Sequence, residues 1–239
     1  QTDSNGFYSF ANLPTSGSYT VAVARNNCTF TPASQVITTP LNNSVLDFTG
    51  VMRTFLLNGY LILPNGQGIP NITVTLAGPE TRTVTTNSAG EYKFDDVRAE
   101  GQHVITPESP FFSFQPESIT LNGLNQNTRA SNIVGTRDKY TISGATGLPD
   151  TLLNLSGDAS ATFTSGADGN YSFLVDAGLD YTIIASKQHY TFSPAIRVFQ
   201  AISGNRTGEN FAPILNTHTI SGNIGLGGVT VTLNGSAGA

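Results

Sequence analysis

Apolar and small polar residues alternate along several short stretches of the chain. In residues 72–78, 181–186 and 229–233, Val, Ile, Leu, Tyr or Ala occupies every second position apart from Gly78, and most of the positions between are Thr or Ser. A strand with one face on a core and the other in water has this period. No stretch shows the 3.6-residue period of an amphipathic helix. The pattern predicts an all-β chain of antiparallel sheets.

A turn followed by a short aromatic strand occurs three times. The sequences SNGFYSF, SAGEYKF and ADGNYSF begin at residues 4, 88 and 167, and their central glycines lie 84 and 79 residues apart. A second motif, CTFTP, FSFQP or YTFSP, follows each copy at nearly the same spacing. A fixed period in two independent motifs indicates a tandem repeat, each unit being large enough for a seven-stranded sandwich with its own core.

The repeats do not begin where the chain begins. An opening-strand motif appears as LLNGYL, TISGAT and TISGNI at residues 56–61, 141–146 and 219–224, and the third copy has no continuation after it. The matching continuation lies at the N-terminus. The expected domains are two β-sandwiches at 54–137 and 138–216, and a split one whose C-terminal part is 1–53 and whose opening strands are 217–239.

Composition excludes two classes of partner. The net charge is −5, and the 11 Lys and Arg residues form no cluster, which argues against binding to nucleic acid. No apolar run approaches the roughly 20 residues of a membrane-spanning helix. The lone Cys28 aligns in the repeat with Phe112 and Tyr190, so we expect a small core-facing hydrophobe rather than a disulfide.

No catalytic, cofactor or metal site is expected, and the chain is predicted not to be an enzyme. The three His residues lie at unrelated repeat positions, and no phosphate loop, zinc-protease motif or Cys-rich spacing is present. An acidic group near residues 91–100 could offer oxygens to Ca²⁺, but it is absent from the other repeats. A solvated surface is the favoured interpretation of that group.

The repeats resemble the carboxypeptidase regulatory-like domain, a transthyretin-like or Cna-B-like β-sandwich of bacterial surface proteins. The motifs that carry the resemblance are the opening ISG, the VTVTL strand, the hairpin ending in GxYxF, and YTFxP. The resemblance implies a tandem Ig-like scaffold with no activity of its own. It also raises a cross-link between Lys139 and Asn210, for which the sequence shows no assisting acid; a solvated Lys139 is favoured.

The two parts of the split domain are predicted to complete each other between neighbouring copies. A domain without its opening strands leaves unpaired backbone groups beside an apolar groove, and strands from another copy can fill it. The residues expected to line the groove are Tyr8, Phe10, Tyr19, Val21 and Phe30. The residues expected to be donated are Ile220, Ile224, Val229, Val231 and Leu233.

The predicted function is a structural subunit of an extracellular filament or surface fibre, a head-to-tail homopolymer. Separate subunits and one long covalent repeat polypeptide both fit the sequence. The alternative is a stalk or binding module of a secreted or cell-surface adhesin. Attached or bound glycans are a further expectation, with N-linked acceptor sequences at Asn27, Asn42, Asn71, Asn154, Asn170, Asn205 and Asn234.

Overall fold

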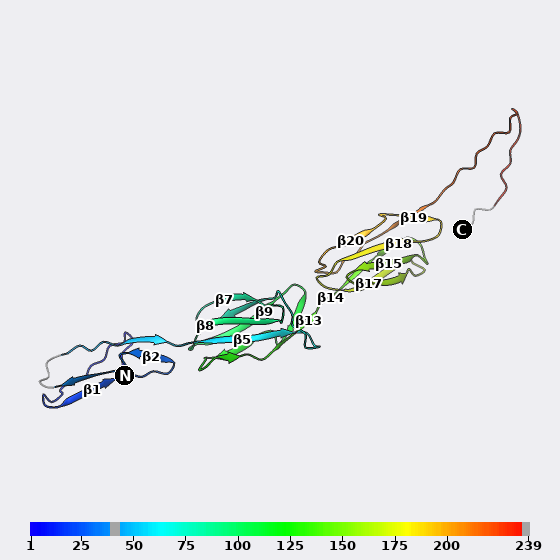
Figure 1. The fold of residues 1–239 in the computed structure, drawn as a ribbon. Helices are drawn as coiled ribbons and strands as arrows, with labels where there is room; N and C mark the ends of the chain where they lie inside the picture. The colour runs from blue at the N-terminus through cyan, green and yellow to red at the C-terminus, as the bar shows by residue number, and fades with distance from the viewer. Residues whose placement is uncertain (39–43, 236–239) are drawn as a thin grey trace. The chain divides into compact units, whose positions relative to one another are not determined.

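The computed structural model describes residues 1–38 and 44–235 (Figure 1). Every regular element in these residues is a β-strand, which confirms the all-β prediction. The chain divides into two compact units, Gln1–Asp138 and Lys139–Ala239. Of the predicted acceptor sequences for sugar, Asn42 and the Ser236 of the sequence at Asn234 lie outside the described residues.

The larger part of the first unit is a sandwich of two sheets. One sheet has the order β10-β13-β5-β12, with β8 also paired to β5, and the other has the order β11-β9-β6-β7. The central strand β5 pairs antiparallel with β8 and parallel with β12 and β13. These strands are β5 (Thr54–Ile62), β6 (Thr73–Ala77), β7 (Arg82–Thr85), β8 (Glu91–Arg98), β9 (Gln102–Glu108), β10 (Phe112–Gln115), β11 (Ile119–Asn122), β12 (Thr128–Arg129) and β13 (Ile133–Arg137).

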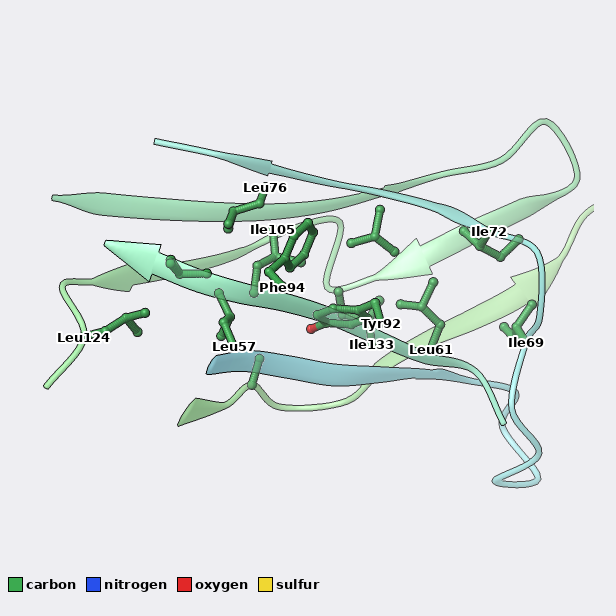
Figure 2. Packing of buried hydrophobic residues seen from close by; sticks show 13 residues of the cluster. Leu57, Leu61, Ile69, Ile72, Leu76, Tyr92, Phe94, Ile105, Leu124 and Ile133 are labelled. Carbon is green, nitrogen blue, oxygen red and sulfur yellow. The ribbon is translucent and has the colours of Figure 1, made fainter. Parts of the chain in front are cut away.

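The core between these sheets comes from alternate positions of the central strands. Leu57 of β5, Leu76 of β6 and Ile105 of β9 are completely buried, and the rings of Tyr92 and Phe94 of β8 pack among them (Figure 2). The residues between them on each strand are more exposed. The alternation in the sequence is therefore the alternation of core and solvent faces.

The second unit contains a sandwich of the same kind. Its strands are β14 (Lys139–Ala145), β15 (Leu152–Gly157), β16 (Ala161–Thr164), β17 (Asn170–Asp176), β18 (Tyr181–Ser186), β19 (Tyr190–Ser193), β20 (Arg197–Phe199) and β21 (Ala212–Leu215). One sheet has the order β16-β15-β18-β20. Strand β14 pairs with β17 on one side, and on the other its Ser143 and Ala145 exchange backbone hydrogen bonds with residues 206–211. Strand β14 is therefore central, as β5 is.

In the N-terminal part of the first unit, residues 1–38 and 44–53 form two separate strand pairs. Strand β1 (Ser18–Ala22) pairs with β3 (Ser34–Thr38), and β2 (Cys28–Thr31) pairs with β4 (Thr49–Met52), both antiparallel. Residues 7–10, whose repeat counterparts lie in β8 and β17, form no strand. The described residues after β21, up to 235, also form none, although their sequence alternates as strands do.

A tyrosine lies over a glycine of the neighbouring strand in both complete sandwiches. Gly59 of β5 is in register with Tyr92, and Gly144 of β14 with Tyr171. A Cβ atom at Gly59 would lie 2.2 Å from Tyr92 Oη. At Gly144 it would lie 2.4 Å from Glu209 O and 3.0 Å from Tyr171 Cε1. Only a residue without a side chain leaves room for the ring.

Replacing this glycine is expected to destabilise the second unit. Gly144→Ala should lower its free energy of unfolding by about 1–3 kcal/mol, because the added methyl group meets a backbone carbonyl and a buried ring. Urea unfolding at neutral pH measures the change. The matched control is Gly204→Ala, since a Cβ there meets no atom within 4 Å. Equal unfolding midpoints for the two variants would contradict the steric account.

A second prediction concerns the buried phenol of Tyr92. Burial raises its pKa from 10.0 to about 12, and its Oη has no hydrogen-bond partner among the described residues. The hydroxyl ionises more readily in the unfolded chain, so its contribution to stability is complete below pH 10 and is lost as the pH rises through about 12. Tyr92→Phe should leave the unfolding free energy at pH 7 nearly unchanged and reduce the alkaline loss. Urea unfolding at pH 7 and above pH 10 tests this, and an unchanged alkaline loss would refute it.

Candidate assembly site

The predicted donor residues are exposed. The side chains of the five predicted donor residues are between 49% and 84% accessible, and the segment that carries them runs after β21 without a strand (Figure 1). These residues are Ile220, Ile224, Val229, Val231 and Leu233. Isolated exposed apolar residues are common on protein surfaces, but these five occupy alternating positions of the two strand-like stretches 220–224 and 229–233.

The same repeat positions are buried in both complete sandwiches. None of the ten counterparts is more than 6% accessible. The counterparts in the first unit are Leu57, Leu61, Ile72, Val74 and Leu76, and in the second Ile142, Thr146, Thr151, Leu153 and Leu155. They lie in or beside β5, β6, β14 and β15, each of which is hydrogen-bonded on both of its sides. The exposed segment thus has the side-chain pattern of two central strands.

The predicted acceptor residues are incompletely covered. Phe10 is 65% accessible, and Tyr8, Tyr19, Val21 and Phe30 are half-buried. The counterparts of Tyr8, Phe10, Tyr19 and Val21 are buried in both complete sandwiches. The counterpart of Phe30 is buried in the second unit. Those in the second unit are Tyr171, Phe173, Tyr181, Ile183 and Phe192. The N-terminal residues therefore have the core face of a sandwich without the strands that would cover it.

The strand pairing shows which two strands of the complete sandwich have no equivalent in the N-terminal part. The pair β1–β3 corresponds to β9–β11, and β9 has a second partner, β6, whereas β1 has no second partner among the described strands. The pair β2–β4 corresponds to β10–β13, and β13 has β5 as its second partner, whereas β4 has none in the same described set. The two missing positions are those of β5 and β6, to which residues 219–224 and 229–233 correspond. Residues 7–10 form no strand because their counterparts in β8 pair with β5.

The side chains considered for a cross-link, a catalytic base or a metal site make ordinary structural contacts. Lys139 Nζ lies 2.5 Å from Asp176 Oδ1, while Asn210 Oδ1 accepts a hydrogen bond from Ala145 N at 2.8 Å, so the two side chains are engaged with different partners. The buried His103 has its Nε2 2.9 Å from Arg98 O. Cys28 is half-buried rather than part of a closed core. No group of three or more His, Cys, Asp or Glu side chains that could hold a metal ion was found in residues 1–38 and 44–235.

Comparison with known proteins agrees with this architecture. The family model of the carboxypeptidase regulatory-like domain matches residues 57–134. Chitinase ChiA of Flavobacterium johnsoniae is 31% identical over 188 residues, which are 70% of this chain and 12% of that protein. The chain therefore spans about an eighth of this relative's length.

Solved structures show likeness at the level of the fold. The TIE protein of Bacillus anthracis superimposes with a TM-score of 0.58 at 14% identity, over 89% of this chain and 44% of that one. The minor pilin GBS52 of Streptococcus agalactiae matches with a TM-score of only 0.31 at 11% identity, over 70% of this chain and all of that one, which does not establish a shared arrangement.

The class of protein is thus a tandem array of Ig-like, transthyretin-like β-sandwiches. The first complete repeat, matched at residues 57–134, is a carboxypeptidase regulatory-like domain. The described residues include no helix that is long and apolar enough to cross a bilayer.

Amide hydrogen exchange should distinguish the uncovered segments from the central strands. The protein is kept dilute enough not to associate. The amides of residues 7–10 and 217–235 should then exchange rapidly, because they are not paired in a sheet. The amides of β5 and β14 should be protected. Mass spectrometry after proteolysis measures both. Protection of residues 217–235 in a chain shown to be monomeric would contradict the described structure.

Proposed function

We propose that the chain is a structural, non-catalytic element of an extracellular filament or surface fibre. In this proposal, residues 217–239 of one copy supply the opening strands of the sandwich whose C-terminal part is residues 1–53 of the next copy. The observation that supports it best is the contrast in burial: apolar positions that are covered in two complete repeats are uncovered in the two parts of the third.

The apolar surface available favours association. Burying a large aliphatic side chain contributes roughly 1.5–3 kcal/mol, so the five donor residues together could contribute about 8–15 kcal/mol before the cost of ordering the segment. The phenyl and phenol rings of the N-terminal part add to this on the acceptor side. The hydrophobic contribution is an upper bound, because the free segments already bury part of their surface.

Backbone hydrogen bonds would give the association its direction. The free edges of β1 and β4 present unpaired N–H and C=O groups, which favour an added strand. Donor and acceptor are different surfaces of one chain, so the contact is head-to-tail and repeats from copy to copy. The partner is then the chain itself, and the homopolymer grows as a filament unless the rotation between copies closes a ring.

The split sandwich could also be completed within one covalent polypeptide. If one copy continues into the next through a peptide bond, the strands meet within one polypeptide and the string of sandwiches is the same. The relationship to a protein named as a chitinase supports a location outside the cell or on its surface, because chitin is an insoluble polymer that cells do not take up. The five acceptor sequences for N-linked sugar that lie wholly within the described residues are compatible with glycans on such a fibre.

One observation favours a second candidate function. The chain matches only 12% of Chitinase ChiA, so related repeats occur within a much longer protein. The repeats would then be a stalk or binding module that spaces or attaches another domain. A stalk whose split sandwich is completed within its own polypeptide would not recruit further copies, and this separates it from a filament.

A charge in the donor segment is expected to prevent assembly. Val231→Asp places a carboxylate at a position whose counterparts, Val74 and Leu153, are completely buried. The purified variant should elute as a monomer in size-exclusion chromatography under conditions in which the unmodified chain forms large assemblies, while circular dichroism and unfolding of the complete sandwiches remain unchanged.

The control for this variant carries the same charge on the opposite face. Thr230→Asp lies at a position whose counterparts, Thr73 and Leu152, are exposed, so it should assemble like the unmodified chain. Assembly of Val231→Asp at the normal extent would refute strand complementation. An unmodified chain that remains monomeric at all concentrations would favour the stalk.

A further inference from the structure

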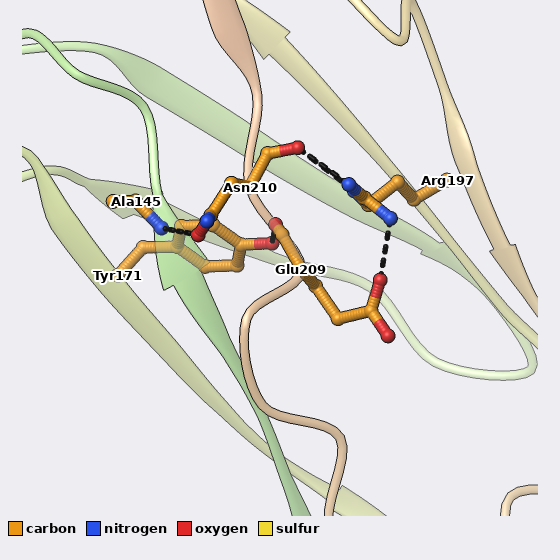
Figure 3. Close-up of polar contacts among 5 residues, drawn as sticks. All are labelled: Ala145, Tyr171, Arg197, Glu209 and Asn210. Carbon is orange, nitrogen blue, oxygen red and sulfur yellow. Dashed lines mark hydrogen bonds and ion pairs between the residues drawn. The ribbon is translucent and has the colours of Figure 1, made fainter.

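In the incomplete N-terminal part, Tyr8 makes the same kind of hydrogen bond that its counterpart Tyr171 makes in the second unit. Tyr8 Oη donates a hydrogen bond to Leu46 O at 2.7 Å. In the second unit, Tyr171 Oη donates to Glu209 O, and Figure 3 shows the phenol directed at this carbonyl. Leu46 and Glu209 are equivalent, since each lies two residues before a phenylalanine of the aromatic cluster.

The surrounding rings have the same geometry in the two places. The centroids of Tyr8 and Phe10 lie 5.8 Å apart at 62°, and those of Tyr171 and Phe173 lie 6.0 Å apart at 61°. Tyr8 and Phe48 lie 6.2 Å apart at 50°. Their counterparts Tyr171 and Phe211 lie 6.1 Å apart at 48°. The aromatic cluster is therefore formed before any strand is added.

In the second unit a strand passes between the elements that this hydrogen bond connects. Strand β14 is bonded to β17 on one side and to residues 206–211 on the other, and the hydrogen bond from Tyr171 to Glu209 crosses it at Gly144. A side chain at this position would collide with both partners of the bond. The bond from Tyr8 to Leu46 is the equivalent of this bond, so a strand placed as β14 is placed would need a glycine beneath it. The space for such a strand is called the slot.

The donor segment has a glycine at the required position. Residues 219–222 have the sequence TISG, identical to residues 141–144 at the start of β14, so Gly222 corresponds to Gly144. A Cβ on Gly222 would meet no atom within 4 Å in the single chain, and its φ is not in the left-handed region. The conformation of the free segment therefore does not require this glycine.

Resting on the proposed function, we propose that Gly222 of a second copy lies beneath the Tyr8–Leu46 hydrogen bond and sets the register of the added strand. Strand β14 pairs Gly144 with Tyr171, Ser143 with Ser172 and Ile142 with Phe173. The same register places Gly222 opposite Tyr8, Ser221 opposite Ser9 and Ile220 opposite Phe10. A slip by one residue would bring a side chain under the ring and turn Ile220 to solvent.

The opposite edge of the slot supports the same register. Asn210 Oδ1 accepts a hydrogen bond from Ala145 N at 2.8 Å (Figure 3). The counterparts of these two residues are Asp47 and Asn223. Asp47 is exposed, and its carboxylate can accept from the Asn223 N–H once the strand is in place. Each edge of the slot thus offers a specific contact to one residue of the donor.

A disulfide between opposite residues tests the register. With Cys28→Ser as the background, Ser9→Cys and Ser221→Cys should form a disulfide between copies under mild oxidation, because directly opposed residues of antiparallel strands are close enough to be bridged. Denaturing electrophoresis without reductant should show a ladder. The control pair, Ser9→Cys with Thr219→Cys, lies on the same face but two residues out of register, and should give at least tenfold less cross-linked product.

A methyl group at the glycine tests the slot. Gly222→Ala should weaken assembly about tenfold or more, measured as the concentration at which half of the chain sediments, because its Cβ would enter the space beneath the Tyr8 ring. Gly227→Ala is the matched control, since this glycine also has open surroundings and no left-handed φ. It should assemble like the unmodified chain.

The outcomes separate this inference from the proposed function. Normal assembly of Gly222→Ala, or cross-linking through residue 219 in preference to 221, would overturn the register while leaving strand complementation in place. A disulfide formed within one chain would show that the added strand comes from the same chain and not from a second copy. A chain that neither assembles nor forms any cross-link between copies would overturn the proposed function itself.

Discussion

The pairing of a central strand with neighbours on both of its sides is the interaction on which this architecture depends. Strand β5 joins β8 to β12 and β13, and β14 joins β17 to residues 206–211. Such a strand supplies hydrogen bonds to two edges and alternate side chains to the core. Without such a strand, the remaining strand pairs form but are not joined into one sheet. This is observed for the pairs β1–β3 and β2–β4.

Local and long-range interactions separate clearly in the N-terminal part. The turn of the first SNGFYSF copy is present, with Asp3 Oδ1 accepting hydrogen bonds from Asn5 N and Phe7 N at 2.9 Å. Its strand is absent, because a turn needs only its own residues and a strand needs a partner. The pairs β1–β3 and β2–β4 persist since both members of each pair lie within residues 1–53. The aromatic cluster around Tyr8 persists for the same reason.

The family relationship is compatible with more than one use of the same scaffold. A β-sandwich of this kind supplies a core, edges and turns, and the fold by itself does not set the function. In the proposed assembly, the completed sandwich would have the same contacts whether copies were joined by a peptide bond or by strand exchange. The difference is one of kinetics and reversibility: a donated strand can dissociate, and a covalent one remains at a high effective concentration.

The sequence alone determined the strand content, the repeat and the faces of the strands, because these follow from alternation within a few residues and from a spacing that can be counted. It also predicted Ile220 and Val231 as donor residues, whose exposure in the single chain is now observed, while their docking in a second copy remains a proposal. Only the tertiary structure decided the contacts between distant residues. Lys139 pairs with Asp176, a tyrosine crosses a glycine in each complete sandwich, and Tyr8 reaches the carbonyl of Leu46, 38 residues away. These contacts depend on the register of strands that are far apart in the chain, and an alternating pattern specifies which face a residue takes but not which residue lies opposite it.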